Sequence, residues 1–256
     1  MAEKSGVQSV ERIFQLIESL AAHPAGAGLQ RLAQDTDLAK STVHRLLASL
    51  VSLGYAAQDE NGRYRLTLKM FELSSGIVNS MDIMDVAKVH LERLAQRTGE
   101  AVHLVIQDGV DIVYIYKAEA GAGLGGMRMS SHVGLRIPMY CTGVGKAILA
   151  TQSYGEAERV WRKSSIRALT AHTITDFDAF IEQLKRVRMA GYAIDDEENE
   201  LGIRCVALAV PGMNGRAEAA FSISGLAAQM TDDRIEHLAR MGLAARQDIL
   251  RDLGWK

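Results

Sequence analysis

The residues that decide the fold of the first part of the chain run from Leu29 to Leu47: Leu-Gln-Arg-Leu-Ala-Gln-Asp-Thr-Asp-Leu-Ala-Lys-Ser-Thr-Val-His-Arg-Leu-Leu. Apolar residues recur at helical spacing on both sides of residues 36–39, and those four positions leave room for a tight turn only. We expect a first helix over 29–35 and a second one that begins near Ser41 or Thr42, both of which are good N-cap residues. Two short helices joined in this way are typical of a helix-turn-helix.

The segments on either side of this stretch complete a winged helix-turn-helix. After it, the strands Tyr55–Gln58 and Arg63–Leu66 flank Asn61-Gly62, and this dipeptide predicts a hairpin closed by a type I′ turn. Before it, a helix is predicted from Ser9 to Leu20. The apolar face of that helix is expected to bury against a second copy of the chain, and it comprises Val10, Ile13, Ile17 and Leu20.

The polar side chains of this region favour DNA binding. The exposed face of the helix after the turn carries Ser41, Thr42 and Arg45, and the wing adds Arg63 and Arg65. Hydroxyl groups and guanidinium groups in these places suit contacts to phosphates and base edges. A helix face that is merely solvated would more often carry Glu and Lys. The alternative is a small helical subdomain without a role at DNA.

The composition of the 256-residue chain is that of an ordinary globular protein, with 48% hydrophobic and 23% charged residues. It excludes a disordered or collagen-like chain. No apolar run is long enough to span a bilayer. The two cysteines, Cys141 and Cys205, belong to no CxxC motif, so we expect a reducing, cytoplasmic location without membrane association.

The net charge of −2 argues mildly against nucleic-acid binding. The charge is unevenly distributed, however. Residues 1–70 hold 8 Lys/Arg against 7 Asp/Glu, whereas residues 71–256 hold 21 against 24. Because local patches rather than totals decide phosphate binding, the first part of the chain remains the candidate for contact with DNA.

The remainder of the chain predicts a connecting helix over 69–80 and then an α+β domain. The helix that starts at Ile83 is closed by Gly99. Strands and helices then follow in an order that predicts an antiparallel sheet. The expected strands are 101–107, 112–117, 192–195, 203–210 and 219–224, and the expected helices are 143–151, 154–163, 177–190 and 231–253.

Two glycine motifs lack the surrounding sequence that a nucleotide-binding site requires. Gly121, Gly123 and Gly126 spell GxGxxG, but no helix and no βαβ unit follow, so a hairpin loop is expected there and not a dinucleotide site. The pair Gly145-Lys146 resembles the end of a P-loop, but the first glycine and the final Ser/Thr of that motif are missing.

The cysteines give a weak case for chemistry. Cys141 precedes an expected helix N-terminus, which would lower the pKa of its thiol. Nothing in the spacing places a base beside it, and buried, inert cysteines are the commoner case. A zinc site built from His103, Cys141, Asp195 and Cys205 is equally unsupported, because no pair has ligand spacing. No catalytic residue, cofactor or metal is predicted.

Polar groups of three segments suggest a site for a small carboxylate. Residues 141–146 open a helix with small side chains, which leaves backbone N–H groups accessible to an anion. Ser222 and Ser224 share one face of a strand, and Phe221 and Ile223 share the other. Asp195 ends a neighbouring strand. The alternative is that both serines bond to backbone or water.

The helix-turn-helix quoted above resembles that of the IclR family of bacterial transcriptional regulators, most of all in the segment 40–47. The similarity continues in the family's order over nearly the whole chain. One departure is Asp37, which stands where glycine is usual, although Asp tolerates the left-handed conformation better than most residues. The further matching segments are 64–66, 113–115, 143–147, 196–205 and 222–225, of which 196–202, together with 137–141, is most similar to regulators of sugar-acid catabolism.

The resemblance implies an α+β fold class with three parts. These are a winged helix-turn-helix DNA-binding domain (1–68), a linker helix (69–81) and a GAF-like effector-binding domain (82–256). It also implies a homodimer through the N-terminal domain, which often pairs again into a dimer of dimers. The implied DNA contacts are Lys40, Ser41, Thr42, His44, Arg45, Arg63 and Arg65, and the implied effector contacts are Gly143, Val144, Asp195, Cys205, Ser222 and Ser224.

The sequence therefore predicts a DNA-binding regulator, and more specifically a repressor of a catabolic operon. Its partners would be double-stranded operator DNA and a small carboxylate effector such as a sugar acid or keto acid. Two other classes remain open. One is a thiol-dependent enzyme on a GAF-like fold that uses Cys141 or Cys205, and the other is a ligand-binding module without DNA binding.

Overall fold

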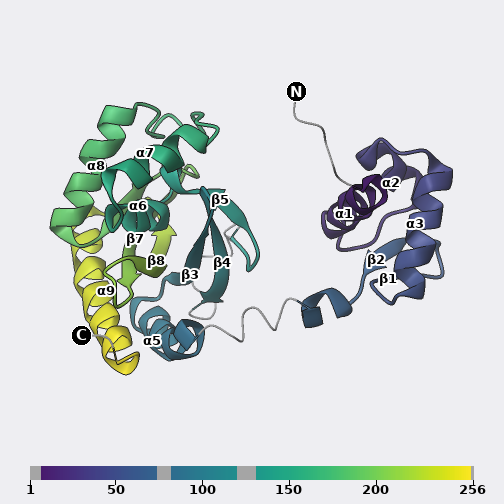
Figure 1. The fold of residues 1–256 in the computed structure, drawn as a ribbon. Helices are drawn as coiled ribbons and strands as arrows, with labels where there is room; N and C mark the ends of the chain where they lie inside the picture. Colours follow the sequence, from purple (N-terminus) through teal and green to yellow (C-terminus); the bar gives the residue numbers. More distant parts are fainter. Residues whose placement is uncertain (1–6, 74–81, 120–130, 255–256) are drawn as a thin grey trace. The chain divides into compact units, whose positions relative to one another are not determined.

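The computed structural model describes residues 7–73, 82–119 and 131–254, and the chain divides into two compact units, residues 1–80 and 81–256. In the first unit, three helices and a two-stranded hairpin enclose a small core (Figure 1). Leu16, Leu32 and Leu47 form its fully buried centre. The elements are α1 (Gln8–Ala21), α2 (Leu29–Thr36), α3 (Lys40–Ser52), β1 (Ala56–Gln58) and β2 (Tyr64–Leu66).

The turn between α2 and α3 is the tight one predicted. Asp37 adopts the left-handed conformation, with φ of 51°, which is the geometry that glycine would otherwise supply. The next helix starts near the predicted position, but its predicted N-cap is wrong. Helix α3 begins at Lys40 after Ala39, and no side chain caps it, so Ser41 and Thr42 lie inside the first turn.

The wing hairpin forms, but its turn differs from the predicted type I′. That turn needs positive φ at two successive residues, and among the described non-glycine residues only Asp37 and Glu197 have it. Gly62 alone is left-handed in this loop. The Asp59 Oδ1 atom accepts hydrogen bonds from the N–H groups of Asn61 and Arg63, each at 2.9 Å. This Asx-type closure stabilises a longer loop.

The face of helix α1 that was predicted to bury against a second copy packs in part against the core of its own unit. Leu16 and Leu20 are buried, with 0% and 1% exposure, whereas Val10 is 51% exposed. Leu20 is therefore unavailable to a second copy, because it packs inside its own unit. The large apolar side chains left exposed here are Val10 and Phe14 of α1 and Val7, the N-cap residue before it.

The second unit contains a six-stranded sheet in the order β5-β4-β3-β8-β7-β6. Its neighbouring strands are antiparallel, as predicted, whereas their order was not predicted. The short strand β5 pairs with β4 and was not predicted. The strands are β3 (Ala101–Asp108), β4 (Asp111–Ala118), β5 (Arg136–Pro138), β6 (Ala193–Asp196), β7 (Ile203–Pro211) and β8 (Ala217–Leu226). The helices are α5 (Asp82–Thr98), the 3-10 turn η1 (Met139–Cys141), α6 (Gly143–Ala150), α7 (Tyr154–Lys163), α8 (Phe177–Ala190) and α9 (Asp232–Asp252).

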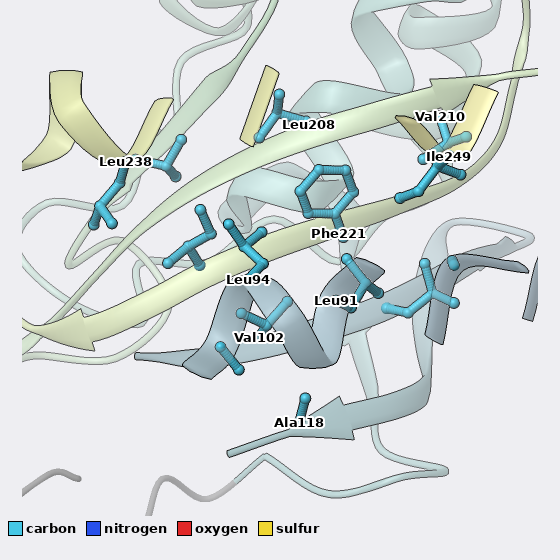
Figure 2. Packing of buried hydrophobic residues seen from close by; sticks show 14 of the residues in the cluster. Leu91, Leu94, Val102, Ala118, Leu208, Val210, Phe221, Leu238 and Ile249 are labelled. Carbon is cyan, nitrogen blue, oxygen red and sulfur yellow. The ribbon is translucent and has the colours of Figure 1, made fainter. Parts of the chain in front are cut away.

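Helices cover both faces of this sheet. Side chains of α5 and α9 meet one face, where Phe221 lies among Leu91, Leu208 and Ile249 (Figure 2). Helices α6, α7 and α8, together with η1, pack on the other face. Because side chains alternate along a strand, Ser222 and Ser224 face the side opposite Phe221. They lie on the α6 side of the sheet.

Two predictions fall partly or wholly on residues that are not described. Residues 69–73 are helical, while 74–81 of the predicted linker helix lie outside the described part of the chain. The same is true of Gly121, Gly123 and Gly126. Among the residues that are described, no helix is both long and apolar enough to cross a membrane.

Candidate functional site

The predicted DNA contacts lie together on the outer face of α3 and on the wing. Helix α3 buries Val43 and Leu47 in the core, which turns its opposite face to solvent. Thr42 is half-buried and the other six predicted contacts are exposed. Four of the seven are cations: Lys40, Arg45, Arg63 and Arg65. Within the described residues none of the four forms an ion pair with a carboxylate, so their charge is available to a polyanion.

The six predicted effector contacts line one cavity of about 40 Å³ in the second unit. They come from four elements that are far apart in sequence. Gly143 and Val144 begin α6, Asp195 lies on β6, Cys205 on β7, and Ser222 and Ser224 on β8. A cavity of this size suits a ligand with few non-hydrogen atoms, since pockets for drug-sized ligands are many times larger.

The register of the sheet explains why the strand residues meet. Asp195 is paired with Cys205, and Cys205 with Ser224, so the three side chains form one row across β6, β7 and β8. In the next row on the same face, Ser222 is paired with His103 of β3. Residues directly opposite each other on antiparallel strands lie close enough to contact.

The start of α6 supplies donors to this cavity. The Thr142 Oγ1 atom accepts a hydrogen bond from the Gly145 N–H group at 3.1 Å and so caps the helix. A Cβ atom on Gly145 would lie 2.2 Å from the Met139 carbonyl oxygen, so this position requires glycine. Gly143 and Val144 line the cavity, and the N–H groups of a first helical turn have no partner inside the helix. They suit an anionic oxygen.

Asp195 titrates near neutral pH. Burial raises the pKa of this carboxyl group to about 7, the nearby Lys146 lowers it, and Glu198 raises it. The Asp195 Oδ1 atom accepts a hydrogen bond from the Glu198 N–H group at 2.9 Å. One wall of the cavity therefore changes between a carboxylate and a hydrogen-bond donor within the physiological range.

A buried ion pair supports the cavity from behind. Lys146 on α6 is fully buried, and its Nζ atom donates a hydrogen bond to Oε1 of Glu198, which is 4% exposed. The Oε2 atom of Glu198 is buried without a hydrogen-bond partner among the described residues. In the sequence, Lys146 stands out only as part of an incomplete P-loop motif. A lysine inside the otherwise apolar segment 144–150 was the available signal.

Sequence reasoning also missed His103 as a pocket residue. It is 2% exposed and lines the cavity with Tyr114 and Ser131. Its Nδ1 atom lies 3.4 Å from the hydroxyl oxygens of both Ser222 and Ser224, and its Nε2 atom lies 2.9 Å from that of Ser131. The available signal was the alternation of side chains along the strand 101–107. It places the His103 side chain on the face of the sheet opposite to that of its two neighbours, which face the core.

Burial disfavours the thiolate form of both cysteines. Burial raises the pKa of the Cys141 thiol to about 12, so the prediction of a lowered value is wrong. The Cys141 side chain lies at the end of η1 and donates to the Pro138 carbonyl oxygen at 3.5 Å. Burial also raises the pKa of Cys205 far above its usual value. Across the described ranges, no group of three or more His, Cys, Asp or Glu side chains could hold a metal.

Two family models match the chain. The model described as "IclR helix-turn-helix domain" matches residues 9–60, and the model described as "Bacterial transcriptional regulator IclR C-terminal" matches residues 75–251. The first match contains α1, α2, α3 and β1, and the second contains the whole sheet around the cavity.

Curated relatives and solved structures agree with these matches. The chain is 34% identical to the transcriptional regulator KdgR of Escherichia coli over 96% of its own length and 92% of the relative's. It is 36% identical to XynR of the same organism, with 93% and 95% covered. The structure of the IclR protein of Thermotoga maritima superposes with a TM-score of 0.82 at 30% identity, covering 96% of this chain and 99% of that one.

Proposed function

The chain belongs to the IclR family of bacterial transcriptional regulators, and from that membership we propose that it represses a catabolic operon under the control of a small carboxylate. It is a DNA-binding regulator and not an enzyme, because both matched models and the relatives are those of transcriptional regulators. Repression is supported by YiaJ of Escherichia coli, which is 34% identical and named a DNA-binding transcriptional repressor.

The convergence of Gly143, Val144, Asp195, Cys205, Ser222 and Ser224 on one small cavity carries the effector proposal. The helix start would receive the carboxylate of the effector, while the serines and Asp195 would bind its hydroxyl or keto oxygens. The hydroxyl and carboxyl groups among the walls favour an oxygen-rich ligand, such as a sugar acid or a keto acid, over a large apolar one.

The DNA-binding part of the proposal assigns roles by position. Arg45 and its neighbours Lys40, Ser41, Thr42 and His44 would enter the major groove, because the N-terminal residues of a recognition helix contact base edges. Arg63 and Arg65 would hold phosphates from the wing. In this scheme 1–68 binds DNA, 69–81 links and 82–256 binds the effector. Because it would bind operator DNA, the protein is proposed to act in the cytoplasm.

Selection of genomic fragments by the purified full chain tests this function. Fluorescence anisotropy on the enriched site would then be measured with and without pyruvate, glycerate, D-gluconate or D-galactonate. We expect tight, salt-dependent binding that one of these acids changes. A double variant, Ser222→Ala/Ser224→Ala, should keep operator binding and lose the response to the acid. Failure to enrich any site at low salt would overturn the proposal.

Affinity for the acid is expected to fall as the pH rises above 7. An anionic effector favours protonated Asp195, which donates a hydrogen bond, over the carboxylate, which repels the effector. Since the pKa of Asp195 is about 7 in the free protein, binding takes up a proton above that pH. Isothermal titration with the acid identified above should give affinity about five- to tenfold weaker at pH 8 than at pH 6.

Asp195→Asn is the control for this pH dependence, because Asn has the same shape and no charge in this range. The variant should bind the acid with nearly the same affinity at pH 6 and pH 8. A wild-type affinity that does not change between these pH values would show that Asp195 is not coupled to the effector.

The exposed apolar side chains of α1 are proposed to pair two copies of the chain. Val7, Val10 and Phe14 are 67%, 51% and 56% exposed and lie along one helix. Phe14→Asp is expected to break this pairing and so to halve the mass of the assembly in solution, since it would place a charge in an apolar interface. Light scattering after size-exclusion chromatography measures this change. The effector-binding domains are proposed to join such dimers into a dimer of dimers.

Met213→Asp is the matched control for Phe14→Asp, because Met213 is an 88% exposed apolar residue in the other unit. It should leave the mass in solution unchanged. A mass in solution that Phe14→Asp leaves unchanged would exclude this face of α1 as the interface.

A further inference from the structure

His103 is enclosed by hydroxyl groups from two directions. On one side of the ring, Nδ1 is equidistant from Ser222 and Ser224 at 3.4 Å, and the two hydroxyl oxygens lie 3.2 Å apart. On the other side, Nε2 lies 2.9 Å from Ser131 Oγ. The ring of Tyr114 meets the imidazole edge-on at 5.3 Å between centroids and fixes its orientation.

The imidazole is neutral at physiological pH. Burial, and after it the positive charge of Lys117, lower the pKa of His103 to about 4, and Glu119 opposes them. Lys117 Nζ also donates to the carbonyl oxygen of Ser131 at 3.0 Å, so this serine is held by two neighbours. A neutral imidazole has one N–H donor and one acceptor nitrogen, and its surroundings decide which is which.

The two equal distances favour one tautomer over the other. An sp² nitrogen without a proton has one lone pair and cannot accept fully from two hydroxyl groups, whereas one N–H group is commonly shared by two acceptors. We propose that His103 carries its proton on Nδ1 and thereby holds Ser222 and Ser224 as acceptors toward the ring and donors toward the cavity. Nε2 then accepts from the hydroxyl group of Ser131.

This arrangement identifies the part of a ligand that the serine wall takes. With the opposite tautomer, one of the two serine hydroxyl groups would donate its hydrogen bond to Nδ1. With the proton on Nδ1, the ring takes neither serine proton, so a ligand oxygen that displaces the hydrogen bond between Ser222 and Ser224 can accept from both. The serine wall therefore takes an acceptor such as the α-keto oxygen of the effector, and His103 is a positioning residue for it. This ligand assignment rests on the proposed effector function, and the tautomer does not.

Nitrogen-15 spectroscopy of the full-length chain tests the tautomer without any ligand. Long-range proton–nitrogen correlation on histidine-labelled protein distinguishes a protonated ring nitrogen from an unprotonated one, and loss of the signal in His103→Asn assigns it. We expect a protonated Nδ1 and an unprotonated Nε2 from pH 6 to 8. An unprotonated Nδ1 would overturn the proposal.

Two variants test the positioning role. Asn at 103 keeps a donor near the position of Nδ1, whereas Gln at 103 places its amide near that of Nε2. With pyruvate as the acceptor-bearing probe in isothermal titration, His103→Asn should keep affinity within about threefold and His103→Gln should lower it by about tenfold or more. Circular dichroism and thermal melting confirm that both variants fold.

The outcomes separate this inference from the proposed function. Equal affinity of the two folded variants for pyruvate would overturn the positioning role while leaving the effector function intact. If wild-type protein binds none of pyruvate, glycerate, D-gluconate and D-galactonate, the effector function and the ligand assignment both fail. The spectrum of His103 still decides the tautomer in that case.

Discussion

Lys146→Met is expected to destabilise the effector-binding unit by about 3–5 kcal/mol, because it leaves the Glu198 carboxylate buried without its counter-charge. The carboxylate has little alternative support, since its Oε2 atom already has no hydrogen-bond partner among the described residues. For a domain of this size the loss corresponds to a fall in Tm of roughly 6–20 °C. Urea unfolding followed by tryptophan fluorescence measures it, because Trp161 packs against Phe180 inside this unit.

Two further variants separate the buried charge from the loss of a long side chain. Lys163→Met removes an exposed lysine at the end of α7 and should change stability by less than about 0.5 kcal/mol. Lys146→Met/Glu198→Leu removes both charges and should recover most of the lost stability, since apolar replacement of a whole buried pair is often neutral. If Lys146→Met lowers the free energy of unfolding no more than Lys163→Met does, the ion pair does not stabilise the unit.

The ion pair also connects helix α6 to the loop after β6. The carbonyl oxygens of Glu197 and Glu198 accept hydrogen bonds from the hydroxyl groups of Thr170 and Thr173, at 2.7 and 2.6 Å. Glu198 in turn donates its N–H to Asp195. The position of the Asp195 carboxyl in the cavity therefore depends on a salt bridge outside the cavity.

Elements with strong local signals could be predicted from the sequence. Helices α7 and α8 have the predicted bounds because a side chain caps the start of each. Ser153 forms a capping box at the start of α7, and Asp176 caps α8. The alternation of serines with apolar residues correctly placed Ser222 and Ser224 opposite Phe221. In these places the local chemistry and the tertiary structure favour the same conformation.

Features that depend on distant residues could not be predicted in the same way. The pKa of Cys141 rises because burial outweighs the adjacent helix start, and burial is a property of the whole fold. Lys146 and Glu198 are 52 positions apart, and no periodicity relates them. The contact between His103 and Ser222 follows from the pairing of β3 with β8, which the order of the strands leaves undetermined.

Arg45→Ala is expected to weaken operator binding by about 1–3 kcal/mol, or roughly 5- to 150-fold. Arg45 lies on the exposed face of α3, near the helix start that reads base edges in a helix-turn-helix. Its guanidinium group can bind guanine in a bidentate manner, and alanine removes both hydrogen bonds. Fluorescence anisotropy on the selected operator and on a fragment of unrelated sequence measures the loss and the change in specificity.

The stability of the folded protein should not change, because Arg45 is exposed and has no ion pair among the described residues. Arg240→Ala is the matched control. It removes the same charge from the exposed face of α9, where Arg240 lies 3.9 Å from Glu236, and it should leave operator affinity unchanged.

Arg65→Ala, on the wing, should weaken binding to both DNA fragments alike and reduce the salt slope of binding by about 1. An Arg45→Ala variant that binds the operator as tightly as wild type would remove Arg45 from the recognition surface. The outward face of α3 would then need another role, since its opposite face is already committed to the core by Val43, Leu46 and Leu47.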